Sequence, residues 1–87
     1  MRMTAELSLY PLSENYEAIV LSFIDRLLEQ QPVSAVTNSM STQVTGESAA
    51  VFSAIQAALE ASYATFGKQV LVAKFIPEHF VDIEPAG

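Results

Sequence analysis

The first third of the chain shows two hydrophobic periods in succession. Residues 4–10 alternate apolar and polar side chains, which is typical of a β-strand, and Pro11 is expected to end that strand. From Ser13 onward apolar residues recur every three or four positions, which predicts an amphipathic helix that Ser13 caps and that stops before Pro32. The apolar stripe of this helix consists of Tyr16, Ile19, Val20, Phe23, Ile24, Leu27 and Leu28.

The middle of the chain predicts two short strands. They span residues 33–39 and 40–45, and the second of them is rich in β-branched and hydroxyl side chains. No Asn-Gly or Asp-Gly pair separates them, so a hairpin bend at 38–40 is inferred from the two strands rather than from a turn motif. Gly46 is expected to break the run.

The last part predicts a second helix and a fourth strand. The helix covers residues 47–66 with an alanine-rich apolar side, and Gly67 stands where a left-handed residue commonly ends a helix. Residues 69–76 predict the strand, which Pro77 ends. Residues 78–87 form an acidic tail without clear periodicity.

The order β-α-β-β-α-β predicts a ferredoxin-like α+β domain over residues 1–77, followed by the tail. We expect a four-stranded antiparallel sheet with both helices on one face and with the first and third strands in its centre. The fourth strand is apolar on both sides, because Leu71, Ala73 and Phe75 alternate with Val70, Val72 and Ile76. We therefore expect the open sheet face to pack on a second copy, which makes a homo-oligomer, either a dimer or a tetramer.

Composition narrows the class of partner. Hydrophobic residues make up 51% of the 87-residue chain and charged residues 16%, which is typical of a folded domain. Ten acids against four bases give a net charge of −6, which argues against nucleic acid as a partner. No apolar run is long enough to insert into a membrane. The start of the sequence does not resemble a signal peptide, so we expect a cytoplasmic protein.

Motifs for catalysis are sparse. The single histidine, His79, lies in the tail beside acidic residues, and we interpret it as an exposed residue. The sequence has no phosphate-binding loop, nucleophile elbow or metal-ligand spacing, and no cysteine. We therefore expect no metal, no cofactor and no catalysis. A small cofactor-independent enzyme, an isomerase or oxygenase with His79 or Glu6 as base, stays open as an alternative.

Polar side chains on the predicted central strands are the most informative feature. Glu6, Ser8 and Tyr10 share one face of the first strand, and Ser41, Gln43 and Thr45 share one face of the third. Buried polar groups need partners. One interpretation is an internal pair, such as Glu6 with Lys74 of the fourth strand, in a purely structural oligomeric protein. The other is a polar pocket that binds a flat ligand, with Tyr10 stacking on it and Glu6 facing a cation.

Two strings carry a family resemblance. Ser8-Leu9-Tyr10-Pro11-Leu12 is followed by Met40-Ser41-Thr42-Gln43 with Gly46-Glu47 opening the second helix. Together they resemble the YkoF-like family over residues 3–77. The resemblance implies binding of thiamine or of its hydroxymethylpyrimidine precursor, in vitamin B1 salvage or uptake, without turnover. Single-repeat members of the family form dimers or tetramers.

The resemblance and the strand pattern together give a set of candidate ligand-binding residues. Glutamine is common in the family where Glu6 stands, which bears on the ligand preferred here. The individual contacts follow from strand polarity and not from the family strings. The candidates are Glu6, Ser8, Tyr10, Asn38, Ser41, Thr42 and Gln43.

Overall fold

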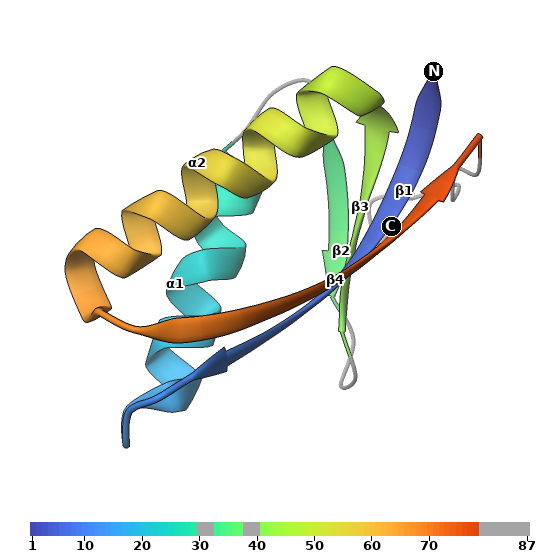
Figure 1. The fold of residues 1–87 in the computed structure, drawn as a ribbon. Coiled ribbons are helices and arrows are strands. Elements are labelled where there is room, and N and C mark those ends of the chain that lie inside the picture. The colour runs from blue at the N-terminus through green and yellow to red at the C-terminus, as the bar shows by residue number, and fades with distance from the viewer. Residues whose placement is uncertain (30–32, 38–40, 79–87) are drawn as a thin grey trace, which may run out of the picture.

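The chain folds into one sheet with a layer of helices on a single face. The computed structural model describes residues 1–29, 33–37 and 41–78. All strand pairs are antiparallel, in the order β2-β3-β1-β4, and both helices lie on the same side of the sheet (Figure 1). The predicted ferredoxin-like α+β fold is thus confirmed. The elements are β1 (Arg2–Pro11), α1 (Tyr16–Leu28), β2 (Ser34–Thr37), β3 (Thr42–Glu47), α2 (Ser48–Phe66) and β4 (Gln69–Pro77).

The central strand β1 pairs over different lengths with its two neighbours. Its pairing with β3 begins at Arg2 opposite Glu47 and ends at Leu7 opposite Thr42. Its pairing with β4 continues to Pro11 opposite Gln69. The last part of β1 therefore lies beside β4 on one edge and beyond the end of β3 on the other.

Pro11 is part of β1, although it was expected to end the strand before it. Backbone groups of successive strand residues point to opposite edges. The carbonyl of Arg2 accepts a hydrogen bond from Glu78 and the N–H of Leu12 donates to Lys68, so even-numbered residues face β4. Pro11, an odd-numbered residue, would direct an N–H toward the β3 side, where β3 has already ended. Proline therefore costs no ladder hydrogen bond at this position.

Gly46 also lies inside a strand, which contradicts the expected break. It is buried opposite Met3, and β3 continues to Glu47 before α2 begins at Ser48. Glu47 is the N-cap residue of α2, and its carboxylate lies 3.1 Å from the amino group of Met1. The hairpin bend predicted at 38–40 lies outside the described residues.

The helix ends differ in detail from the expected ones. Ser13 is not the N-cap of α1; Asn15 is, and the Ser13 hydroxyl accepts a hydrogen bond from the Asn15 N–H at 3.3 Å. At the end of α2, Gly67 has the expected positive φ of 85°. Its ψ of −152° places it outside the left-handed helical region. Its N–H donates to the Tyr63 carbonyl at 2.8 Å, which closes the last turn.

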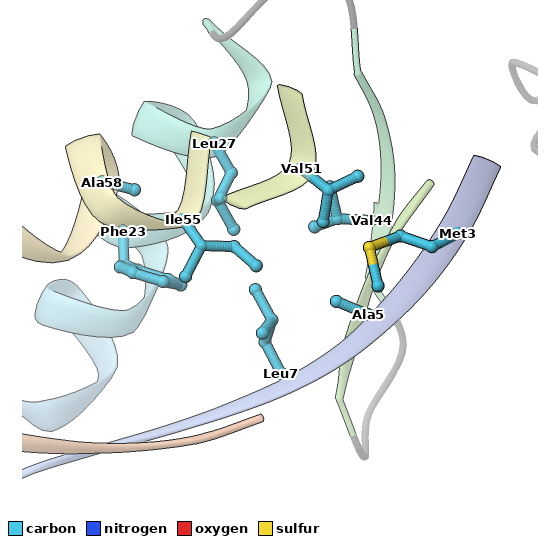
Figure 2. Packing of buried hydrophobic residues seen from close by; sticks show 9 residues of the cluster. All are labelled: Met3, Ala5, Leu7, Phe23, Leu27, Val44, Val51, Ile55 and Ala58. Carbon is cyan, nitrogen blue, oxygen red and sulfur yellow. The ribbon is translucent and has the colours of Figure 1, made fainter. Parts of the chain in front are cut away.

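The core lies between the helix layer and the sheet, and it is built mainly from β1 and the two helices (Figure 2). Side chains of β1 point toward those of the helices, and Val44 of β3 joins them. Phe52 of α2 stacks on Phe75 of β4, with ring centroids 4.6 Å apart. The core cluster consists of Met3, Ala5, Leu7, Phe23, Leu27, Val44, Val51, Ile55 and Ala58.

The predicted apolar stripe of α1 is wider than the part that the core buries. Ile19, Phe23 and Leu27 are buried, whereas Tyr16 and Leu28 are exposed. The buried residues recur at the four-residue spacing of one helix face. Tyr16 and Leu28 lie in the first and last turns of the helix, at its two ends.

We expect Leu27→Ala to lower the free energy of unfolding by about 2–5 kcal/mol, because it leaves a cavity in the core. Leu27 is fully buried, and its neighbour Leu28 is 53% exposed. Leu28→Ala is the matched control and should change stability by about 0.5 kcal/mol or less. Urea unfolding of both variants measures the difference, and equal losses would contradict the packing described here.

Candidate functional site

Glu6 stands in the middle of the open sheet face, the side without helices, and it has protein partners there. One carboxylate oxygen lies 3.6 Å from Nζ of Lys74 on β4. The other accepts a hydrogen bond of 3.2 Å from the hydroxyl of Ser41. This is the internal pair that the strand pattern offered as an alternative. The charge of Glu6 is therefore balanced within the chain.

The buried threonines of the central strands also have hydrogen-bond partners. Thr4 and Thr45 face each other across β1 and β3, and their hydroxyls form a 3.0 Å hydrogen bond. Thr45 donates in addition to the Met3 carbonyl at 3.2 Å. Within the described residues, no buried side-chain nitrogen or oxygen lacks a hydrogen-bond partner.

A pocket of about 160 Å³ lies where β1 extends beyond β3, at the seam between the sheet and α1. We call it the seam pocket. Its walls combine apolar side chains of α1 and β1 with hydroxyl groups from the ends of β2 and β3. It is lined by Leu7, Ser8, Leu9, Tyr10, Val20, Phe23, Ile24, Thr37, Ser41 and Thr42.

Leu9 of β1 lines this pocket, two residues past the last described pair of β1 with β3. Odd-numbered residues of β1 direct both backbone groups toward the β3 side, as the hydrogen bond from Ser48 to the Met1 carbonyl shows at the other end. The β1–β3 pairing ends at Leu7. Over the described part of the chain, no strand residue is paired with Leu9 on that side. The position opposite Leu9 in the β1–β3 register falls outside the described residues, and Leu9 itself lines the pocket.

Three hydroxyl groups lie at the opposite wall. Those of Thr37 and Thr42 share a hydrogen bond of 2.8 Å, in which either can be the donor. The Ser41 hydroxyl directs its proton at Glu6, so toward a ligand it acts as an acceptor. Glu6 thus influences the pocket through Ser41, although it does not line the pocket itself.

The structure brings together four of the seven candidate residues. Ser8, Tyr10, Ser41 and Thr42 line the seam pocket. Gln43 lies opposite Glu6 on the open face, outside the pocket. Asn38 lies outside the described residues.

Other lining groups were not predicted as site residues. Val20 and Ile24 belong to the apolar stripe of α1, and their spacing gave no reason to separate them from the core. The backbone of Leu9 has no signature in the sequence, because its role comes from the unequal pairing of β1. Thr37 is the exception: a hydroxyl residue at the end of the predicted strand pair was a signal available in the sequence.

Two features are absent from residues 1–29, 33–37 and 41–78. No group of three or more histidine, cysteine, aspartate or glutamate side chains there is placed to hold a metal ion. Neither α1 nor α2 combines the length and the apolar character that crossing a membrane requires.

Comparisons with known proteins are consistent with the fold. The model of the YkoF-related family matches residues 2–75. A Streptococcus pneumoniae protein superposes with a TM-score of 0.80 at 21% identity, covering 95% of this chain and 93% of that one. A candidate thiamine biosynthesis/salvage protein of Thermotoga maritima gives 0.74 at 13%, over 86% and 82%. A domain of unknown function from Bacillus cereus gives 0.75 at 19%, over 95% and 84%. The search of curated proteins finds no match.

We expect Glu6→Gln to change the free energy of unfolding by less than about 1 kcal/mol, because both partners of its ion pair are partly exposed. Lys74→Gln should have a similarly small effect. Urea unfolding at low and high ionic strength measures both variants. A loss of about 3 kcal/mol or more would mean that Glu6 behaves as a buried charge that depends on Lys74.

Proposed function

The chain belongs to the YkoF-related family, and on this premise we propose that it binds the pyrimidine ring of thiamine or of hydroxymethylpyrimidine, without turnover, in the seam pocket. The pocket itself is the observation that carries this proposal. The likeness to a candidate thiamine biosynthesis/salvage protein supports a place in vitamin B1 salvage or uptake.

The size of the pocket suits a single aromatic ring. An engineered protein cavity of ~150 Å³ takes up benzene, and the seam pocket has about 160 Å³. Drug-sized ligands occupy pockets of about 300–1,000 Å³. A second ring attached to the first would therefore have to lie outside the seam pocket.

The chemistry of the walls suits an aminopyrimidine. Leu9, Val20 and Ile24, which are half-buried, offer apolar surface to the faces of the ring. An aminopyrimidine carries a ring nitrogen that accepts beside an amino group that donates. In this proposal the N–H and C=O of Leu9 form the complementary pair, as the edge of a strand does for an added peptide. The Ser41 hydroxyl adds an acceptor at the opposite wall.

The pocket also bears on the alternatives to binding. A purely structural protein requires no cavity at the helix–sheet seam, so the pocket argues for a ligand. For an enzyme, Glu6 is the candidate base that the structure describes, and its carboxylate is held by Lys74 and Ser41 on the open face. This arrangement supports binding without catalysis.

Isothermal titration tests the ligand. We expect hydroxymethylpyrimidine to bind the unmodified protein, and Ser41→Ala to weaken binding about two- to twelvefold, the value of one hydrogen bond. Ser53→Ala, which removes an exposed hydroxyl from α2, is the control and should leave the affinity unchanged. If the folded protein bound neither hydroxymethylpyrimidine nor thiamine, the proposal would be contradicted.

We further propose that the open face packs on a second copy of the chain, giving a dimer or a tetramer. Val70, Val72 and Ile76 of β4 are each more than 40% exposed there, a row of large apolar side chains. The ionised residues in the middle of the face, Glu6 and Lys74, neutralise each other. A second copy meets little net charge there, although the whole chain carries −6.

We expect Val72→Lys to weaken self-association at least about tenfold, because each copy would bring an unpaired ammonium group into the interface. Leu28→Lys makes the same change at an exposed position of α1 and should leave the assembly intact. Size-exclusion chromatography with light scattering measures the mass. A monomeric unmodified protein, or equal effects of the two variants, would contradict an interface on the open face.

A further inference from the structure

A second hollow adjoins the seam pocket on the outer side of α1. We call it the α1 groove; its volume is about 460 Å³, and it is lined by Tyr16, Glu17, Val20, Leu21, Ile24 and Thr37. Val20, Ile24 and Thr37 belong to the walls of both hollows. The two hollows therefore lie next to each other, on either side of these three residues.

The groove is formed by the part of the α1 stripe that the core does not bury. Tyr16, Val20 and Ile24 follow one another at four-residue spacing, so their side chains lie in a row along the helix. The helix packs on the sheet through Ile19, Phe23 and Leu27 instead. Tyr16 is 56% exposed and Leu21 is 62% exposed. An aromatic ring and a leucine thus stand at the surface beside the pocket.

The charge of the groove favours a cation. Glu17 is its ionisable side chain besides the phenol of Tyr16, and it lies in the first turn of α1. The helix end contributes about half a positive charge, so one carboxylate leaves this region net negative. Glu14 lies close by and adds to the same sign. The face of an aromatic ring such as that of Tyr16 attracts cations as well.

We propose that the α1 groove binds a positively charged heteroaromatic ring joined to the ring in the seam pocket, with Tyr16 beside it and Glu17 opposing its charge. This inference rests on the proposed function. It gives the two halves of a thiamine-like ligand different sites: the neutral pyrimidine in the seam pocket, and the cationic thiazolium in the groove. It assigns to Tyr16 and Glu17 the roles that the strand pattern suggested for Tyr10 and Glu6.

The test compares two ligands on one set of variants by isothermal titration. Thiamine carries the cationic ring and hydroxymethylpyrimidine lacks it. We expect Glu17→Gln to weaken thiamine binding about two- to fivefold, the value of an exposed charge pair, and Glu17→Lys to weaken it further. Hydroxymethylpyrimidine should bind all three proteins equally. Increasing salt should weaken thiamine binding to the unmodified protein more than to Glu17→Gln.

Glu29→Gln is the matched control, because it removes the same charge from the far end of α1, about 18 Å along the helix. It should leave both affinities unchanged. If Glu17→Gln lowered the affinity for both ligands equally, or did not lower the affinity for thiamine, the proposed site in the α1 groove would be contradicted. The proposed site in the seam pocket would not be affected by that result. Failure of both ligands to bind the unmodified protein would instead overturn the proposed function, and the groove with it. Glu17 is exposed, so the variants should fold, and urea unfolding checks this.

Discussion

The unequal pairing of β1 determines where a ligand can be held. This strand is the centre of the sheet, and it forms its ladder with β4 up to Pro11 but with β3 only up to Leu7. The backbone N–H and C=O groups of a central strand normally form hydrogen bonds with both neighbouring strands. Leu9 lies two residues past the last described pair of the shorter ladder and lines the seam pocket. The side chains of α1 close the space above it, so polar backbone and apolar walls meet in one small pocket.

The two faces of the sheet then have separate roles. The helix face holds the core, and its edge at α1 holds the pocket. The open face has its polar groups satisfied internally, through Glu6 with Lys74 and through the pair of buried threonines. The exposed side chains of that face include the apolar row of β4, which suits contact with another copy. The proposed ligand site and the proposed interface therefore lie on different surfaces, and a variant in one need not disturb the other.

Periodicity and the turn residues were sufficient to predict the fold, because each element buries one regular face. They failed at Pro11 and Gly46, because proline and glycine generally favour the end of a strand. Both residues belong to a strand here, at positions where the ladder accommodates them. For the site, alternation along two central strands pointed to Ser8, Tyr10, Ser41 and Thr42. It could not identify Leu9 as a site residue, because the proposed role of Leu9 depends on its backbone, which has no signature in the sequence. It also could not divide the α1 stripe into core and pocket, because both uses have the same helical spacing.

The central claim is that the ligand lies at the seam beside Leu9 and not on the open face. Proton–nitrogen correlation spectra recorded during titration with hydroxymethylpyrimidine test it most directly. The account predicts that the amide of Leu9 moves downfield as it donates to the ring, together with shifts at Thr42 and Ile24, while Val70 and Ile76 stay in place. Shifts confined to the open-face residues, with the Leu9 amide unmoved, would contradict it.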